Sequence, residues 1–213
     1  MNGPSLFRCP LCGSPLTQKE RGCICPARHS FDRAAAGYVH LLPPNRMHSK
    51  APGDDREMVA ARAAFLERGY YAPLRQALEE LVLEASAHLE GPVLLDSGCG
   101  EGYYTAGMFR ALERAGHRPR AAGIDISKYA LRRAAKRLPE GEFAVASAYR
   151  LPLADASADL LTNVFSPLSA EEFARVLRPG GTFLYVVPSA RHLWEMKQVL
   201  YSQPYENPVK ETP

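Results

Sequence analysis

Residues 93–102 read VLLDSGCGEG, an apolar run followed by a loop with three glycines. The unbroken apolar run predicts a buried strand, and the glycines let the backbone turn sharply and approach a ligand before a helix begins. The dinucleotide-binding fingerprint needs a glycine at position 103, where this chain has Tyr103. The stretch therefore favours S-adenosylmethionine over NAD or FAD, with Gly98 and Gly100 as candidate cofactor contacts and Cys99 as a small filler residue.

Apolar strands and helices alternate along the chain from this loop onward. We expect strands at 93–96, 121–125, 143–146, 160–163 and 182–187, and helices at 105–115, 127–138 and 169–177. This alternation predicts an α/β fold with a doubly wound parallel sheet, of the Rossmann-like type. Ser127 is placed to cap one helix, and Ser169 with Glu172 has the spacing of a capping box.

Two further helices are predicted upstream of the glycine loop. The apolar residues expected on one face are Met58, Ala61, Phe65 and Leu66 in the helix at 57–67, and Leu74, Ala77, Leu78, Leu81 and Ala85 in the helix at 73–88. The polar stretch 43–55, interrupted by prolines and a glycine, indicates a linker or a loop that orders on binding. The Cys-, Pro- and Gly-rich segment before it holds short β-forming pieces at 23–25 and 38–42.

Four residues near the N-terminus have the spacing of metal ligands. Cys9 and Cys12 form a CPLC knuckle. Cys25 follows after twelve intervening residues, and His29 after three more. Thiolates and imidazole in this pattern converge on a structural zinc ion, and a disulfide is the weaker alternative in a reducing compartment. Cys23 is the alternative to Cys25 as the third ligand. On one strand the two side chains would point to opposite faces, so only one of them can reach the metal. The spacing from Cys25 to His29 forms a short turn like that between Cys9 and Cys12. We therefore favour Cys25.

Polar residues after the later strands are candidates for holding a nucleotide and a base. Asp125 lies 23 residues beyond the glycine loop, where an acid accepts ribose hydroxyls; capping the next helix is the alternative. Ser147 follows the third strand, where an adenine would lie, and a surface turn is the alternative. Asn163 and Phe165 follow the fourth strand and suit a planar base held by edge hydrogen bonds and stacking, unless Phe165 belongs to the core.

The composition is that of a globular chain. The 213 residues are 46% hydrophobic with a formal net charge of +3, and residues 1–56 hold eight Lys/Arg against four acidic residues. A basic N-terminal segment predicts an anionic partner such as nucleic acid, with a solvated basic surface as the alternative. Its candidate phosphate contacts are Arg28, Arg33, Arg46 and Lys50. No apolar run is long enough to span a membrane and no signal peptide is evident, so we expect a cytoplasmic protein without membrane contact.

Several motifs together resemble the bacterial large-subunit ribosomal RNA guanine-N1-methyltransferases, the RlmA (RrmA) family, which includes the tylosin-resistance enzyme TlrB. They are CPLC…CPARH, FDRAAAGYVHLLP, PGDDREM, ARAAFLERGYYAPL, LLDSGCGEGYYT, GIDISK and RVLRPGG. The glycine loop and the PGG turn occur in many methyltransferases, whereas the zinc knuckle joined to PGD and GYYxPL is specific. The resemblance covers nearly the whole chain.

The resemblance implies a class I S-adenosylmethionine-dependent methyltransferase that modifies N1 of a guanine in large-subunit ribosomal RNA, as a homodimer. It implies zinc on Cys9, Cys12, Cys25 and His29, and cofactor contacts at Tyr71, Gly100, Glu101 and His192, beside the candidates Gly98 and Asp125. Without the resemblance, Tyr71 is interpreted as a core aromatic and His192 as a polar residue at a helix start. No motif demands a particular catalytic base.

The implied organisation has three parts. Residues 1–45 form a zinc-binding module that contacts RNA, 46–90 form a linker and helices, and 91–213 form the methyltransferase domain. Family chains usually continue further, so we expect the C-terminal strands to be missing. A small-molecule methyltransferase and a non-catalytic zinc-ribbon nucleic-acid-binding protein are the alternative functions.

Overall fold

The centre of the molecule is a parallel β-sheet. The structure is a computed structural model that describes residues 3–43 and 52–209. The sheet has six strands in the order β10-β9-β6-β7-β8-β5. They are β5 (Val39–His40), β6 (Val93–Ser97), β7 (Arg120–Asp125), β8 (Glu142–Val145), β9 (Ala158–Val164) and β10 (Leu177–Val186). The strand order reverses between β6 and β9, and sheets of this kind bind ligands at the carboxyl ends of the strands beside such a reversal.

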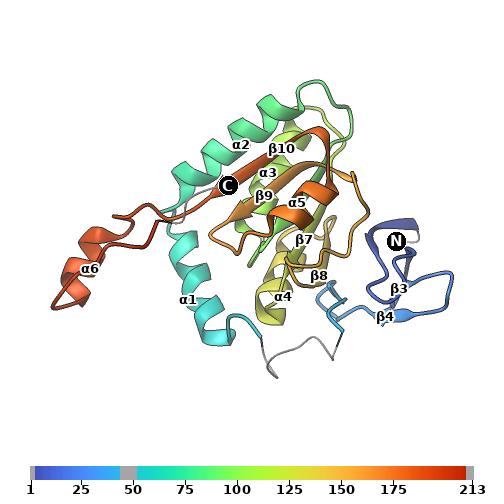
Figure 1. Ribbon diagram of the computed structural model, residues 1–213, viewed down its shortest axis with the longest axis horizontal. Helices are drawn as coiled ribbons and strands as arrows, with labels where there is room; N and C mark the ends of the chain where they lie inside the picture. Colours follow the sequence, from blue (N-terminus) through green and yellow to red (C-terminus); the bar gives the residue numbers. More distant parts are fainter. Residues whose placement is uncertain (1–2, 44–51, 210–213) are drawn as a thin grey trace.

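Different elements cover the two faces of this sheet (Figure 1). The helices are α1 (Arg56–Glu67), α2 (Ala72–Ser86), α3 (Tyr103–Arg114), α4 (Lys128–Arg137), α5 (Ala170–Val176) and α6 (Trp194–Leu200). Leu94 packs in one buried cluster with residues of α2, α3 and α4, whereas its neighbour Leu95 packs in another with residues of α5 and the N-terminal segment. Because successive side chains of a strand point to opposite faces, helices cover one face, and α5 with the N-terminal segment covers the other.

The N-terminal segment forms its own four-stranded antiparallel sheet. Its strands, in sheet order, are β1 (Gly3–Arg8), β2 (Pro15–Lys19), β3 (Gly22–Ile24) and β4 (Ser30–Asp32). Phe7 is 1% exposed and forms an antiparallel bridge with Leu153, and the amide of Arg8 donates to the carbonyl of Pro152 at 2.7 Å. The small sheet is therefore docked through backbone pairing with the loop at 152–153 and through a core that it shares with the large sheet.

The alternation of strands and helices after residue 91 is confirmed, and the predicted β-forming piece at 38–42 adds a sixth strand to this sheet. Val39 pairs with Ala144 and His40 with Val145, so β5 lies beside β8. The sequence does not predict this pairing, and burial of Val39 and Leu41 holds the strand in place. β5 thus covers a sheet edge that would otherwise be open.

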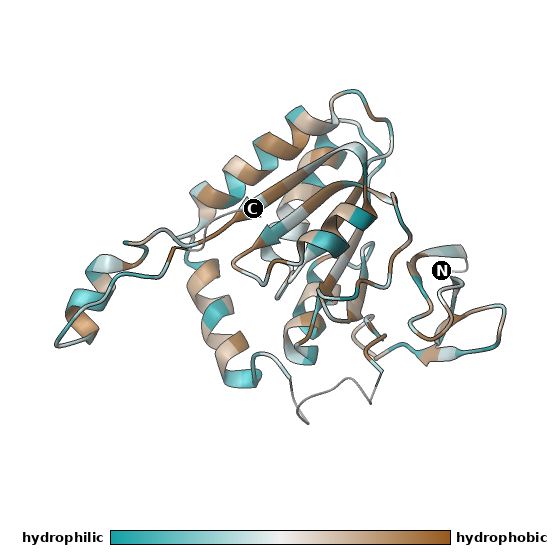
Figure 2. Cartoon of the chain, in the orientation of Figure 1, coloured by the Kyte–Doolittle hydropathy of each residue, from teal (hydrophilic) through white to brown (hydrophobic). Residues whose placement is uncertain are grey.

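The predicted buried faces of α1 and α2 are partly wrong. In α1 the buried residues are Val59, Ala63 and Leu66, whereas Met58 is 52% exposed. Several alanines make more than one face of α1 weakly apolar, so packing selects the buried face. In α2, Leu78 is buried as predicted, but the face continues through Val82 and Ser86, and Ala77 and Leu81 are exposed. Figure 2 shows hydrophobic and hydrophilic residues alternating around both helices.

One of the two predicted helix caps is present. The Ser127 side chain accepts from the amide of Ala130 and caps α4. Ser169 makes no side-chain cap at α5, and the Glu172 carboxylate instead accepts from the amide of Leu151 and pairs with Arg175. The capping box is therefore wrong, because Glu172 has a stronger partner elsewhere.

The last described elements lie at the outer edge of the sheet. β10 is an edge strand within the described part of the chain, and α6 extends away from the body with none of its residues buried (Figure 1). Among the described helices, none combines the length and apolarity needed to cross a bilayer.

The docking of the N-terminal segment can be tested at Phe7. We expect Phe7→Ala to lower the free energy of unfolding by about 3–5 kcal/mol, because it leaves a cavity where the small sheet meets the large one. Denaturant unfolding with zinc present measures this. Val199→Ala, at a side chain 85% exposed, is the control and should change stability by less than about 0.5 kcal/mol. Equal effects of the two substitutions would contradict the shared core.

Candidate functional site

The glycine loop after β6 is held close to the loop after β9. Gly98 has φ +79°, and a Cβ at this position would lie 1.9 Å from Ser166 Oγ, so no side chain fits there. The amides of Gly98 and Cys99 both donate to the carbonyl of Ile124 at 2.9 Å. The loop is thereby fixed to the end of β7 with its backbone facing the space above the sheet.

Asp125 lies at the end of β7 beside this loop. Its carboxylate accepts from the amide of Gly100 at 2.9 Å and from the amide of Ser127 at 2.7 Å. Burial raises the pKa of Asp125, and the two amide hydrogen bonds oppose that rise. The amide of Ser127 stays bonded to Asp125, so the residue also stabilises the start of α4.

A cavity of about 1450 Å³ opens above the carboxyl ends of the strands. Five of the predicted contact residues line it, namely Tyr71, Gly98, Gly100, Glu101 and Asp125, and Ser147 lines it as well. The structure therefore brings these residues together at the point where the strand order reverses. His192 is not among the lining residues and reaches the cavity through Tyr71.

Glu101 has one paired and one unpaired carboxylate oxygen. Oε1 lies 2.7 Å from Arg137 Nη2, and Oε2 is buried with no hydrogen-bond partner. Burial raises the pKa of Glu101, whereas the Arg137 charge lowers it. A buried carboxylate oxygen without a partner is costly, and a ligand hydroxyl or amine in the cavity would satisfy it. The residues present therefore fit a polar, cationic cofactor such as S-adenosylmethionine.

Aromatic side chains gather at one end of the cavity. Tyr71 Oη lies 3.0 Å from His192 Nε2, and the Phe165 ring centroid lies 6.0 Å from Tyr71 and 5.4 Å from His192. Phe165 is 42% exposed and has φ +53°, a conformation that is strained for a bulky residue. Strain of this kind persists where the surroundings enforce it and is common at functional sites.

Asn163 does not contact the cavity, so its predicted role as a base contact is wrong. The residue is fully buried, and its Nδ2 donates to the carbonyls of Ser97 at 3.1 Å and Pro167 at 3.2 Å. It ties β6 to the loop that carries Phe165. Phe165 lines the cavity and is not a core residue, so of the two only Phe165 is placed to meet a base.

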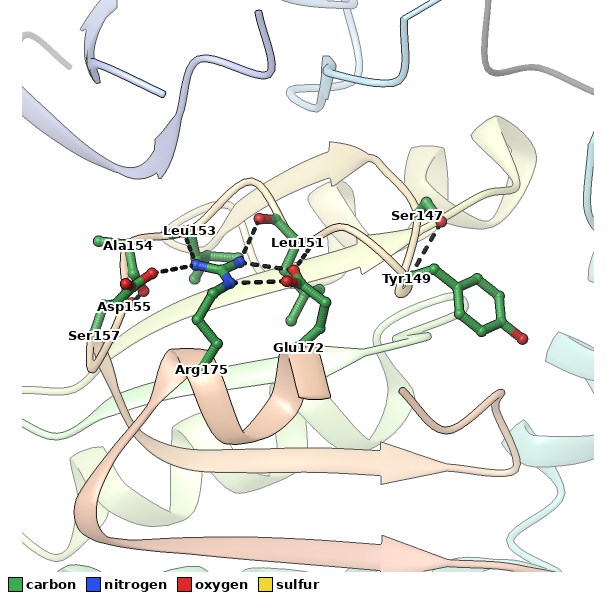
Figure 3. A network of polar contacts seen from close by, with 9 residues as sticks. All are labelled: Ser147, Tyr149, Leu151, Leu153, Ala154, Asp155, Ser157, Glu172 and Arg175. Carbon is green, nitrogen blue, oxygen red and sulfur yellow. Dashed lines mark hydrogen bonds and ion pairs between the residues drawn. The ribbon is translucent and has the colours of Figure 1, made fainter. Parts of the chain in front are cut away.

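The opposite wall of the cavity was not foreseen from the sequence. The Arg175 guanidinium donates to the carbonyls of Leu151 and Leu153 and to the carboxylates of Asp155 and Glu172, at 2.7–3.0 Å (Figure 3). This network holds the loop 151–155 next to residues 8–13 of the N-terminal segment, which line the same cavity. The sequence gives no signal for this role of Arg175, because Leu151, Leu153 and Asp155 lie 20–24 residues away along the chain.

The predicted zinc ligands come together as a group. The ligand atoms of Cys9, Cys12, Cys25 and His29 all lie within 4.8 Å of one another. The Sγ atoms of Cys12 and Cys25 are 3.7 Å apart, and Cys25 Sγ is 3.4 Å from His29 Nδ1. Zn–S and Zn–N bonds of about 2.3 and 2.0 Å in a tetrahedron give separations of this size, so the group fits a closed zinc site.

The two remaining cysteines are buried outside this group. Cys23 is 4% exposed on β3 and packs in the core, which confirms the choice of Cys25 as the member of the cluster. Cys99 is buried in the glycine loop, and burial raises the pKa of its thiol. A thiol that stays protonated is a poor nucleophile, in agreement with a filler role.

Comparisons with known proteins agree with this geometry. Residues 7–50 match the family model of the RlmA N-terminal zinc ribbon, and residues 95–185 match a methyltransferase domain. The chain is 40% identical over 195 residues to the 23S rRNA (guanine(748)-N(1))-methyltransferase of Streptomyces fradiae, covering 91% of this chain and 67% of that protein. It is 42% identical over 209 residues to a Micromonospora griseorubida protein named as a 23S rRNA (guanine-N(1)-)-methyltransferase. The match covers 89% of this chain and 68% of that protein.

The fold also matches solved structures. A Methanococcus maripaludis protein of the S-adenosylmethionine-dependent methyltransferase class superposes with a TM-score of 0.52 at 18% identity, covering 65% of this chain and 66% of that one. At this identity the match supports the class I fold alone.

The metal centre can be tested with two matched cysteine variants. We expect Cys25→Ala to lose bound zinc to a competing chelator, because three ligands remain, while Cys23→Ala keeps about one zinc per chain. Elemental analysis of the purified proteins after chelator dialysis measures both. The reverse pattern would assign the third thiolate to Cys23.

Proposed function

The chain belongs to the family of bacterial 23S rRNA (guanine-N1)-methyltransferases with an RlmA zinc ribbon, and from this premise we propose which residues hold the cofactor and the target base. The chain is an S-adenosylmethionine-dependent enzyme that methylates N1 of a guanine in 23S rRNA. The observation that supports these residue roles is the cavity, because the glycine loop, Asp125 and Phe165 all line it above the point where the strand order reverses.

The cofactor contacts are Tyr71, Gly98, Gly100, Glu101, Asp125 and His192. Asp125 is placed for the ribose hydroxyls, and Ser147 lies along the sheet edge where an adenine would bind. The open backbone at Gly100 and the unpaired Oε2 of Glu101 suit the polar end of the cofactor. When bound, S-adenosylmethionine supplies a methyl group on a sulfonium, which is already a good electrophile. Positioning is then the main task of the protein.

The target guanine stacks on Phe165. A base inside a duplex cannot reach a cavity of this kind, so the nucleotide is flipped out or comes from a loop. The loop that carries Phe165 is rigid, because the Phe165 amide donates to the carbonyl of Val186 at 2.9 Å and Asn163 holds the carbonyl of Pro167. A ring fixed in this way and partly exposed offers a stacking surface at low entropic cost.

The N-terminal segment contacts the RNA backbone. Arg28 is exposed beside the zinc knuckle, and Arg8 lies on the cavity wall. Arg33 instead donates to the carbonyl of Gly37 and to Gln18 Oε1, so it has a structural role. The basic residues Arg46 and Lys50 lie outside the described residues. Phosphate contacts of this kind would add a salt-dependent term to RNA binding.

Assembly and biological setting complete the proposal. We propose a homodimer that works on ribosomal RNA in the cytoplasm, and that methylation lowers susceptibility to macrolide antibiotics. Sedimentation of the zinc-loaded chain tests the first point, and growth of a sensitive strain with and without the chain tests the last.

The reaction is tested by transfer of labelled methyl from S-adenosylmethionine. We expect label at N1 of one guanine in unmodified large-subunit rRNA, and none in DNA or in a metabolite extract assayed in parallel. Asp125→Asn should raise the Kd for S-adenosylmethionine by about 10–100-fold, because a charged hydrogen-bond acceptor contributes about 1.5–3 kcal/mol. Asp155→Asn, in the same cavity but with a side chain 80% exposed, is the matched control and should leave that Kd within about twofold.

The outcomes separate the alternatives. Label only in the metabolite fraction would indicate a small-molecule methyltransferase. Absence of both label and cofactor binding would indicate a zinc-ribbon nucleic-acid-binding protein. A weakened Kd in Asp155→Asn but not in Asp125→Asn would place the cofactor at the other end of the cavity.

The stacking role is tested at Phe165. We expect Phe165→Ala to lower kcat/KM for rRNA by about 5–150-fold, the equivalent of the 1–3 kcal/mol that base stacking contributes, with the cofactor Kd unchanged. Phe165→Tyr should retain most activity. Phe183→Ala, at a partly exposed phenylalanine of β10 that does not line the cavity, is the control. A loss of cofactor affinity in Phe165→Ala would assign this ring to the cofactor instead.

A further inference from the structure

Tyr71 and His192 form a hydrogen-bonded pair next to the stacking surface. Tyr71 precedes α2 and lines the cavity. His192 follows β10, does not line the cavity and contacts Tyr71. The pair is held in place, because the amide of His192 donates to the carbonyl of Ser189 and the Asn207 side chain donates to the carbonyl of His192 at 3.2 Å. The hydroxyl and the imidazole therefore meet from two segments fixed independently of each other.

The reaction at guanine N1 needs a proton acceptor. N1 of the neutral base carries a hydrogen, and its lone pair is free for a methyl group only after that proton has left. Most carboxylates that line the cavity have partners: Asp54 with Arg62, Asp125 with the amides of Gly100 and Ser127, and Asp155 and Glu172 with Arg175. Glu101 pairs with Arg137 through Oε1 only, and its unpaired Oε2 is the proposed contact of the cofactor. Tyr71 and His192 are the polar side chains in ring contact with Phe165.

We propose that Tyr71 Oη accepts the proton from guanine N1 while its own proton passes to His192 Nε2. This step rests on the proposed function. The N1–H bond breaks and its electron pair stays on N1, a new O–H bond forms at Tyr71, and the former tyrosine hydrogen ends on the imidazole. N1 then carries the lone pair that takes the methyl group. Tyr71 is the catalytic residue, and His192 acts through it.

The surroundings of the pair suit this direction of transfer. Burial raises the pKa of Tyr71, so its hydroxyl is protonated at neutral pH and donates to His192. The groups that face the pair are the Phe65 ring from α1, Phe165, and the Tyr104 hydroxyl from α3, whose pKa burial also raises. Two cations lie close in sequence, but each is engaged: Arg75 pairs with Glu79 and Arg191 lies over Trp194. Tyr71 is thus left with His192 as its acceptor.

The test uses the full zinc-loaded chain with Tyr71→Phe and His192→Gln. At saturating cofactor and unmodified rRNA we expect each variant to slow single-turnover methylation at pH 7 by about 10²–10⁴-fold, the usual contribution of a general base. The Kd for RNA should stay within about threefold. Because Tyr71 and His192 are also proposed cofactor contacts, the cofactor Kd is measured separately and the rates are compared at saturating cofactor. In both variants the rate should rise about tenfold per pH unit between pH 7 and 9, because the guanine anion must then form without help, whereas the wild-type rate levels off. Added imidazole should partly rescue His192→Gln.

Two control variants and one measurement without cofactor complete the design. Tyr70→Phe and His88→Gln change exposed residues outside the cavity and should leave rates and pH profiles unchanged. Nitrogen NMR of labelled histidine in the cofactor-free chain should show His192 as the Nδ1–H tautomer, with a shift in Tyr71→Phe where the donor is lost.

The alternatives give different results. If Tyr71→Phe and His192→Gln weaken only the cofactor Kd and keep the wild-type pH profile, the pair holds the cofactor and the proton transfer is wrong, while the proposed function stands. If the wild-type chain transfers no methyl group to rRNA, the proposed function and this inference fail together.

Discussion

The close approach of the glycine loop to the loop after β9 constrains the whole candidate site. A side chain at Gly98 would collide with Ser166, so the two loops can pack in this way only when position 98 is glycine. Asn163 stabilises the same contact, because its Nδ2 donates to the carbonyl of Ser97 before the glycine loop and to the carbonyl of Pro167 in the loop after β9. Phe165, next to Ser166, is thereby kept at a positive φ with its ring in the cavity. The glycine loop and the Phe165 ring are therefore positioned by a single contact.

The carboxylates beneath this contact depend on dipoles rather than on counter-ions. Burial raises the pKa of Asp96 to about 6, and the hydroxyls of Thr105 and Thr162 oppose the rise by donating to its oxygens. Because folding raises this pKa, the stability contributed by Asp96 is fully present below its usual pKa and is lost as the pH rises through about 6. Asp125 is compensated in the same manner by two backbone amides. Such sites accept neutral hydroxyl groups of a ligand without needing another positive charge.

Local chemistry was predictable from the sequence and tertiary partners were not. The strand before the glycine loop, the cap at Ser127 and the Cys9–His29 group each rest on spacing within a short window, and each is present. The buried face of α1, the bond between Glu172 and the Leu151 amide, and the pairing of β5 with β8 depend on partners distant in sequence, which leave no periodic pattern. Asn163 could not be assigned from the sequence for the same reason. An asparagine can contact a ligand or can donate, when buried, to backbone carbonyls, and only the fold shows that it does the second.

The zinc segment is a structural part of the methyltransferase domain. A doubly wound sheet must cover both faces, and here the seven-residue α5 covers only part of the second one. Phe7, Cys9 and Cys25 complete that face by packing in the same core as Leu95 and Leu161. Cys9 is also a metal ligand and a cavity wall, so one residue links zinc coordination, core packing and the shape of the site. Because the free energy of zinc binding contributes to folding of its segment, the metal stabilises the wall of a cavity whose chemistry it takes no part in.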